Sequence, residues 1–355
     1  MILANKVRLK PTPEQESQLW KSADTARWAY NWTLARQEES YRNGKKFIPD
    51  RSLRKELTQL KQTAEYSWLY DVSNNVTKQA VKDACDAYKQ YFKKLSDKPC
   101  FKSRKRSKPT FYNDNVKLKA AEYLPDAAKH INPRVSFDGK YWYLSVGVER
   151  EDEKTNWTGE VIGVDVGVKE LAVCSNGMVF HNVNKTKVVK KTEKRLRRLQ
   201  RKVSRQYEMN KEGSRFVKTC NIVKVENRIR LLHRRLTNIR KNHIHQATAA
   251  IAKTKPSAVV METLNIKGMM KNRHLSKAVA QQKLYELKRQ LQYKCEKYGI
   301  RFTEADKWFP SSKTCSDCGQ FKKDLKLSDR IFKCDCGLKM DRDVNAALNL
   351  AKLAN

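Results

Sequence analysis

The stretch VIGVDVG, residues 161–167, places an aspartate inside a segment that otherwise predicts a buried strand. Four β-branched residues bounded by glycines favour a strand at this point. An unpaired carboxylate buried there would cost several kcal/mol or would have to keep its proton. Asp165 therefore needs a hydrogen-bond partner, a counter-charge or a metal ion.

The charge balance of the chain points to a polyanionic partner. Its 355 residues include 75 Lys and Arg against 38 Asp and Glu, a formal net charge of +37 that is spread along the sequence. Self-repulsion at such a charge destabilises a compact chain until phosphates neutralise it, so nucleic acid is the expected partner. An anionic membrane is the alternative, but the sequence has no run of about 18 apolar residues and becomes charged by Lys6 and Arg8, unlike a signal peptide. We expect a cytoplasmic protein without a membrane partner, long enough for two or three domains.

The cysteines divide into one cluster and five scattered residues. The cluster has two knuckles, Cys315–Gly319 and Cys334–Gly337, and four thiolates so spaced bind Zn²⁺ tetrahedrally. A glycine after each knuckle permits the tight turn that aims backbone N–H groups at sulfur, although the one-residue gap in the second knuckle strains the chelate. We expect a structural zinc site, because four sulfur ligands leave no open position for chemistry. The expected ligands are Cys315, Cys318, Cys334 and Cys336, and the free thiols expected in a reducing compartment are Cys85, Cys100, Cys174, Cys220 and Cys295.

The first 150 residues predict strands at both ends with helices between them. Residues 4–10 predict a short strand, and Thr12–Gln15 has the form of a helix start, with a capping Thr, a Pro at the first helical position and a Gln reaching back. Near the end of this region, residues 134–137 and 141–144 flank an Asp-Gly pair, which predicts a β-hairpin.

Two features of this region have two interpretations each. The aromatic residues Trp28, Tyr30 and Trp32 could stack on bases, but filling the core is the favoured interpretation. The basic run at residues 102–108, flanked by aromatic residues, is equally a solvated loop or a contact with a phosphate backbone.

The second half of the chain predicts strands followed by a basic helical hairpin. Residues 169–174 and 179–180 predict two strands that turn at Asn176-Gly177. From residue 185 to about 252 the apolar spacing predicts two helices that pack together, with a break near Glu212-Gly213 and Lys and Arg on the outside.

Two further acids lie at the ends of predicted elements and could come close to Asp165 in the folded chain. Glu262 ends a short apolar strand at residues 258–261, and either Asp341 or Asp343 precedes a terminal helix. Singly, Asp165 could pair with an arginine, Glu262 could mark the solvent end of a strand, and the third acid could be a helix cap. Together, carboxylates from three elements could hold two Mg²⁺ ions about 4 Å apart for phosphodiester hydrolysis, if the two strands are neighbours. Magnesium would then keep Asp165 ionised.

Four segments, in order, resemble the signature blocks of the TnpB (OrfB) family of insertion-sequence proteins, which are related to the type V CRISPR effectors. The similarity extends along most of the chain, since Arg8–Thr12 and Phe101–Arg104 also resemble that family. The four blocks are Gly163–Lys169, Met261–Met269, Phe309–Cys315 and Asp341–Ala347.

The resemblance implies an α/β multidomain fold. Its parts are a split RNase H-like (RuvC) nuclease domain with a zinc-ribbon insertion, and an N-terminal β-barrel-like wedge domain with an inserted helical recognition domain. We expect the insertion to buttress the nuclease site and to help admit a target strand. The implied boundaries are 1–10 and 96–155 for the wedge, 11–95 for the recognition domain, 156–311 and 338–355 for the nuclease domain, and 312–337 for the zinc finger.

The resemblance also implies an RNA-guided DNA endonuclease, with a guide RNA from the transposon end and a short DNA motif beside the double-stranded target. Asp165, Glu262 and Asp343 match the three catalytic acids, which would bind two Mg²⁺ ions. Asp343 is favoured over Asp341 because it directly precedes the Val-Asn-Ala-Ala match, and Arg330 lies where a cation could reach the scissile phosphate. A monomer in the prokaryotic cytoplasm, associated with the nucleoid, is the implied state.

Three alternatives stay open on the sequence alone. A guided DNA-binding regulator without nuclease activity should have lost one or more acids, whereas all three are present. A zinc-ribbon RNA-binding protein explains the charge and the cysteines but gives Asp165 and Glu262 no purpose. A transposase acting on DNA ends is compatible with the same fold.

Overall fold

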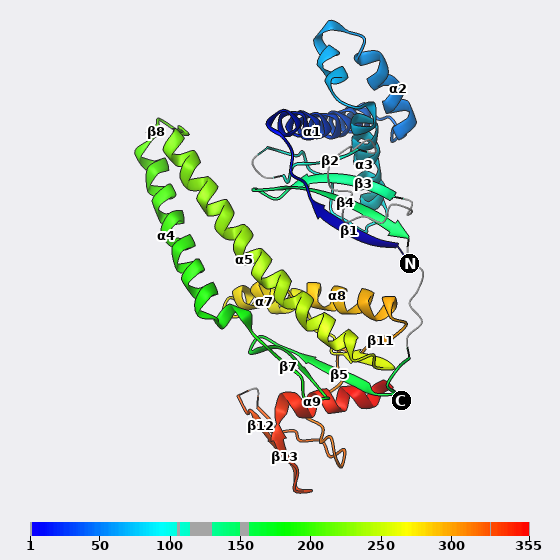
Figure 1. The fold of residues 1–355 in the computed structure, drawn as a ribbon, viewed down its shortest axis with the longest axis vertical. Coiled ribbons are helices and arrows are strands. Elements are labelled where there is room, and N and C mark those ends of the chain that lie inside the picture. The colour runs from blue at the N-terminus through cyan, green and yellow to red at the C-terminus, as the bar shows by residue number, and fades with distance from the viewer. Residues whose placement is uncertain (1, 105–106, 114–129, 150–155, 327, 355) are drawn as a thin grey trace. The chain divides into compact units, whose positions relative to one another are not determined.

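The computed structural model describes residues 2–104, 107–113, 130–149, 156–326 and 328–354 (Figure 1). The chain forms two compact units, Met1–Arg150 and Glu151–Asn355, and each has its own sheet. The predicted α/β multidomain architecture is therefore confirmed, while the finer domain boundaries stay predictions.

The first unit contains a four-stranded antiparallel sheet in the order β1-β4-β3-β2. The predicted hairpin is present: β3 and β4 pair on either side of Asp138-Gly139, and the positive φ of Gly139 (97°) is one that glycine adopts without strain. The predicted first strand is also present, but it begins at Ile2 and ends at Arg8, because Pro11 and the Thr12 cap turn the chain into a helix. The strands are β1 (Ile2–Arg8), β2 (Thr110–Tyr112), β3 (His130–Phe137) and β4 (Trp142–Glu149).

Helices pack on one side of this sheet. The predicted capping box is formed, since Thr12 Oγ1 accepts from the Gln15 N–H and Gln15 Oε1 accepts from the Thr12 N–H. Of the three aromatic residues with two interpretations, Tyr30 is buried, and Trp28 and Trp32 pack half-buried against core clusters. The core interpretation is therefore the better one. The helical elements are α1 (Pro13–Arg42), α2 (Asp50–Leu60), η1 (Ala64–Asp71) and α3 (Asn74–Phe92).

The second unit contains a mixed five-stranded sheet in the order β11-β10-β5-β6-β7. β10 runs parallel to both of its neighbours, and β5, β6 and β7 form an antiparallel meander. The predicted turn at Asn176-Gly177 joins β6 to β7, with a positive φ at Gly177. The strands are β5 (Val161–Val166), β6 (Glu170–Cys174), β7 (Val179–His181), β10 (Ala258–Met261) and β11 (Arg301–Glu304).

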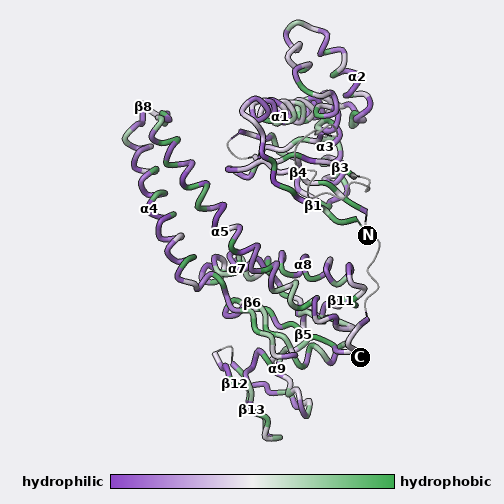
Figure 2. The backbone as a smooth tube through the Cα atoms, viewed as in Figure 1, coloured by the Kyte–Doolittle hydropathy of each residue, from purple (hydrophilic) through white to green (hydrophobic). Residues whose placement is uncertain are grey.

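The predicted basic helices form an antiparallel hairpin, α4 with α5 (Figure 1). The break at residues 212–213 is a tight β8–β9 turn, and most of the hairpin is hydrophilic along its length (Figure 2). α5 continues past this hairpin, and together with α8 it covers the apolar face of the sheet formed by Ile162, Val164 and Val166. The elements are η3 (Val183–Lys185), α4 (Lys187–Met209), β8 (Lys211–Glu212), β9 (Arg215–Phe216), α5 (Cys220–Lys253), α6 (Ile266–Lys271), α7 (Ser276–Gln282) and α8 (Leu284–Lys297).

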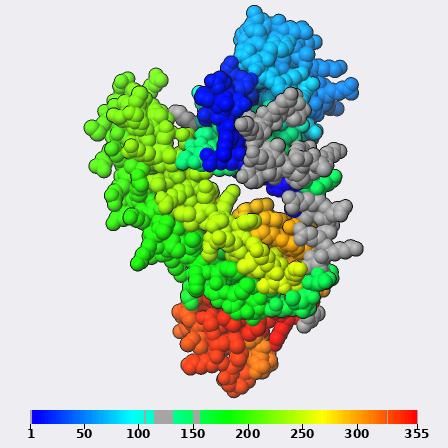
Figure 3. Space-filling model, in the orientation of Figure 1, coloured from blue at the N-terminus to red at the C-terminus, as the bar shows by residue number. Residues whose placement is uncertain are grey.

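The C-terminal residues pack against the sheet of the same unit. They contain a small antiparallel hairpin, β12 (Ile331–Lys333) and β13 (Lys339–Asp341), followed by α9 (Arg342–Ala351) and η4 (Lys352–Ala354). In the space-filling view these red residues lie directly against the green residues of the unit (Figure 3). None of the helices in the described part of the chain is long and apolar enough to cross a bilayer.

Candidate functional site

The register of two parallel strands brings Asp165 and Glu262 together. β5 and β10 are adjacent, with Gly163 opposite Val260 and Val164 opposite Met261. The Glu262 N–H continues this pairing by donating to the Val164 carbonyl at 3.3 Å, which sets Glu262 beside Asp165. Their carboxyl groups lie close enough for each to shift the pKa of the other. The condition that the two strands be neighbours is met.

Helix α9 supplies the third acid by crossing β5 at a glycine. A Cβ on Gly163 would lie 1.9 Å from the Ala347 carbonyl oxygen, so only glycine lets the helix approach this closely. Side chains alternate along a strand, so Asp165 points to the same face as Gly163, the face that α9 covers. Asp343 lies one helical turn before Ala347, and its charge acts directly on Asp165.

The electrostatics of this acidic cluster favour a bound cation. Burial, reinforced by the charges of Glu262 and Asp343, raises the pKa of Asp165 well above its usual range. Burial also raises the pKa of Glu262, with a further contribution from Asp343. Without a cation the pair therefore tends to keep a proton, whereas a divalent cation would replace it. Carboxylate oxygens from three elements are the donor set that Mg²⁺ prefers.

Arg342 is a member of this cluster that the sequence did not reveal. Its guanidinium lies 3.2 Å from Asp343 Oδ1, with both side chains less than one-fifth exposed, and it opposes the rise in pKa of Asp165 and Glu262. An arginine between two acids at the start of a helix is normally solvated. Only the close Asp-Arg-Asp spacing could have suggested that Arg342 belongs to the acid cluster. Unlike those of the cysteines described below, the ligand oxygens of these three acids do not all lie within 4.8 Å of one another.

The two acids weighed for the third position have different roles. Asp341 is the N-cap of α9, and its Oδ1 accepts from the Asp343 N–H at 2.8 Å. Asp343 instead acts on Asp165 and Glu262, which agrees with the preference for it. The predicted cation Arg330 has an exposed side chain, and its carbonyl accepts from the Arg342 N–H at 2.8 Å. It is not among the charges that shift Asp165 or Glu262, and its proposed role stays a prediction.

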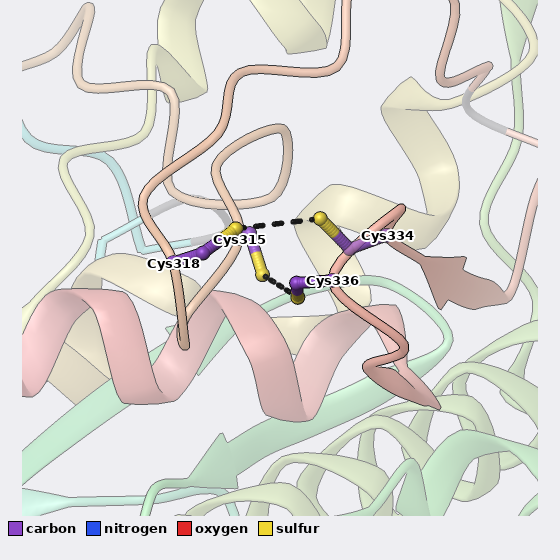
Figure 4. Close-up of side chains that lie close together, drawn as sticks. All are labelled: Cys315, Cys318, Cys334 and Cys336. Atoms are coloured by element: carbon purple, nitrogen blue, oxygen red, sulfur yellow. Dashed lines mark hydrogen bonds between the residues drawn. The ribbon is translucent and has the colours of Figure 1, made fainter.

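The four cysteines converge as a tetrahedral metal site requires (Figure 4). The Sγ atoms of Cys315 and Cys336 lie 3.7 Å apart, and those of Cys318 and Cys334 lie 3.5 Å apart. A zinc tetrahedron with bonds of about 2.3 Å has sulfur atoms about 3.8 Å apart. Among the described residues, these cysteines are the one group of three or more His, Cys, Asp or Glu whose ligand atoms all lie within 4.8 Å of one another. The one-residue gap in the second knuckle does not exclude Cys336.

The turns of the two knuckles have the predicted form. Gly319 and Gly337 follow them with φ values of 77° and 94°, and their N–H groups donate to the carbonyls of Cys315 and Cys334. Burial opposes ionisation of Cys315, but backbone N–H groups of Cys318 and Asp317 lower the pKa of its thiol to about 7. Cys315 can therefore supply a metal-binding thiolate near neutral pH, whereas the pKa values of Cys334 and Cys336 are raised and these thiols would lose their protons to a bound metal.

Side-chain amides tie the first knuckle to the helix that carries Asp343. Buried Asn345 of α9 accepts from the Ser316 N–H at 2.9 Å and donates to the Thr314 carbonyl at 2.7 Å. One turn later, Asn349 donates to the carbonyls of Ser311 and Thr314. These hydrogen bonds attach the first cysteine turn to the helix that carries Asp343. Such a contact is expected if the insertion buttresses the nuclease site.

Three family models match successive parts of the chain. They are described as "Helix-turn-helix domain" of IS605 OrfB at residues 1–46, "Probable transposase" of IS605 OrfB at residues 144–273, and "Cas12f1-like, TNB domain" at residues 285–350.

Curated relatives and a solved structure extend this similarity over nearly the whole chain. A Streptomyces pristinaespiralis protein named "Putative RNA-guided DNA endonuclease" is 31% identical over 98% of this chain and 88% of its own length. An Escherichia coli K12 protein of that name, InsQ, is 30% identical over 98% of this chain and 91% of its own length. The structure titled a Cas12f1-sgRNA-target DNA complex matches with a TM-score of 0.60 and 17% identity, covering 95% of this chain and 83% of the other. The two share a multidomain RuvC-type fold.

Proposed function

The chain belongs to the TnpB (OrfB) family of insertion-sequence proteins, and from this premise we propose that it is an RNA-guided DNA endonuclease. The observation that carries the proposal is the meeting of Asp165, Glu262 and Asp343 on one face of the sheet, with burial and mutual repulsion raising the pKa of Asp165. The curated relatives with the name RNA-guided DNA endonuclease support the same activity.

In this proposal Asp165, Glu262 and Asp343 would hold two Mg²⁺ ions beside the DNA backbone. Bound there, the ions would activate a water and stabilise the leaving oxygen of the phosphodiester. Asp165 and Glu262, whose raised pKa values favour a retained proton, would ionise when they hold the ions, and Asp343 would complete the set from α9. Arg342 would offset part of the negative charge of the acids through its ion pair with Asp343. Arg330 would contact the scissile phosphate.

The rest of the chain would bind nucleic acid. Its net charge of +37 suits the phosphate backbones of a guide RNA and double-stranded DNA, while base pairing with the guide selects the target beside a short DNA motif. The guide would come from the transposon end, and the chain would act as a monomer in the prokaryotic cytoplasm. The four cysteines would hold a structural Zn²⁺.

The decisive experiment combines RNA recovery with a cleavage assay. RNA that copurifies after a high-salt wash is sequenced, and a DNA duplex matching it is then incubated with the complex, with and without Mg²⁺. Cleavage of the matched duplex only with Mg²⁺ is expected. Glu262→Gln should retain the RNA and lose cleavage.

The alternatives predict different outcomes of the same assay. Guided binding without cleavage by the wild type would indicate the nuclease-inactive regulator, and joining of transposon ends would indicate the transposase. Wild-type cutting by Glu262→Gln would overturn the assignment of the acids. No observation in this structure favours either alternative over the nuclease.

A further inference from the structure

The first unit contains a pocket lined by aromatic side chains, which are distant in sequence from Asp165, Glu262 and Asp343. It lies where the C-terminal ends of α1 and α3 meet and has a volume of about 480 Å³, within the ~300–1,000 Å³ typical of ligand sites. Five aromatic side chains line it: Tyr41, Phe47, Tyr88, Tyr91 and Phe92. Three of them are exposed, Tyr41 at 83%, Phe92 at 57% and Tyr91 at 39%. Leaving such rings exposed needs an explanation beyond packing of the core.

The rings form a ready surface for stacking. The Phe92 ring is stacked on Tyr88 with centroids 5.9 Å apart, and it meets Phe47 edge to face at 5.7 Å. The Tyr91 ring also lies 5.7 Å from Phe92. A planar ligand that enters the pocket can therefore extend an aromatic stack that already exists.

The rim of the pocket is cationic. Arg42, Lys45, Lys46 and Lys98 line it, against a single acid, Glu38, which pairs with Lys98 at 3.2 Å. The C-terminal end of a helix attracts cations, and that accounts for Arg42. It does not account for exposed lysines gathered beside exposed aromatic rings. Together they suit a ligand with an aromatic face and a negative backbone.

The pocket is held open by local hydrogen bonds. Gln37 binds both the N–H and the carbonyl of Ile48, and Ser40 Oγ donates to the Lys46 carbonyl, which fixes the turn after α1 as one wall. Tyr88 is 95% buried in the opposite wall, and its hydroxyl has no hydrogen-bond partner among the described residues. A preformed wall reduces the entropic cost of binding.

We propose that this pocket binds an unpaired base of single-stranded RNA. The base would stack on Phe92 with Tyr91 at its edge, since these two rings are inclined by 48°, and the lysines of the rim would contact the flanking phosphates. Glu38 would favour RNA over DNA, because its carboxylate can accept a hydrogen bond from the ribose 2′-hydroxyl that DNA lacks. The inference rests on the proposed function only for its RNA partner, and its site is separate from the acids.

The test measures binding of short probes to the full-length chain stripped of nucleic acid, without any cleavage step. The probes are single-stranded oligouridylate, oligodeoxyuridylate of equal length, and an oligomer of abasic riboses, at a salt concentration that suppresses binding through phosphate alone. The variants are Phe92→Leu and, as the matched control, Tyr70→Leu, an aromatic ring of the same unit that is 63% exposed outside the pocket.

Phe92→Leu should weaken oligouridylate binding by roughly tenfold, the loss of one stacked base, and should leave binding of the abasic oligomer unchanged. Tyr70→Leu should bind both like the wild type. Equal affinities for wild type and Phe92→Leu, an equal loss in Tyr70→Leu, or equal binding of the deoxy probe would overturn the proposal. Failure of DNA cleavage would leave these results untouched, so the two proposals fail separately.

Discussion

The acid cluster and the cysteine cluster differ in how closely the folded chain, without a metal ion, brings their ligand atoms together. The four sulfur atoms already stand within 4.8 Å of one another on two short turns. The three acids come from β5, from the residue after β10 and from α9, and one of them pairs with Arg342. Burial raises the pKa of Asp165, whereas backbone N–H groups lower that of Cys315 to about 7 against the effect of burial. If the two clusters have the proposed roles, local turns preform the structural site, whereas the site for exchangeable ions and substrate keeps an excess of negative charge.

The two clusters are nevertheless joined. Asn345 and Asn349 bond the first cysteine turn to α9, which carries Asp343. Damage to the cysteine site should therefore reach the acids, whereas damage to the acids should leave the cysteines intact. This asymmetry can be tested with single substitutions.

The largest effect is expected from Asp165→Asn. Loss of one metal-binding carboxylate should lower the cleavage rate by at least about a thousandfold. This corresponds to a loss of several kcal/mol of transition-state stabilisation. Zinc content, measured by atomic absorption, should not change. The matched control is Asp341→Asn, since Asn caps a helix as well as Asp does and the rate should stay near wild type. A comparable loss in the control would mean that α9, not the acid, had been disturbed.

The second effect is expected from Cys318→Ser. Bound zinc should fall to near zero, and the free energy of unfolding should drop by roughly 3 kcal/mol, because the metal stabilises only the folded turns. Cleavage should slow as well, through Asn345. Cys100→Ser, an exposed thiol outside the cluster, serves as the control and should change neither quantity. Unchanged zinc in Cys318→Ser would remove the case for a four-cysteine site.

The third effect concerns the crossing of α9 over β5. Gly163→Ala forces a methyl group into the Ala347 carbonyl and should cost about 2–3 kcal/mol in stability, with a loss of cleavage as Asp343 moves away. Gly167→Ala is the matched control, because its Cβ would meet nothing closer than 3.6 Å. Thermal unfolding and cleavage rates check both variants. Equal stability of Gly163→Ala and Gly167→Ala would show that α9 can shift away from β5 at little cost in free energy.

The smallest effect is expected from Arg342→Gln. Burial and the neighbouring acids raise the pKa of Asp165, and Arg342 opposes that rise, so its removal should raise the pKa further. Because the ionised acids bind metal, the acidic limb of the pH–rate profile should move to higher pH, by up to about one unit. Arg330→Gln should leave that limb in place. A larger shift for Arg330→Gln would make it, and not Arg342, the cation that tunes the acids.

The local elements were predictable because their signals lie within a few residues. The Thr12 capping box, the Asp138-Gly139 hairpin and the glycines after the cysteine knuckles all have the predicted form. Asp343 could be preferred over Asp341 from its place in a motif alone. Arg342 could not be recognised, because its role depends on which side of α9 faces the sheet.

The sequence by itself determined the local elements named above, the spacing of the sulfur ligands and the excess of positive charge, since propensity, turn chemistry and charge act locally or add up along the chain. Only the tertiary structure decided that β10 lies parallel to β5 in the register that sets Glu262 beside Asp165. It also decided that α9 crosses at Gly163. Both depend on which distant apolar faces pack together, and that packing, rather than any local preference, determines where buried carboxylates meet.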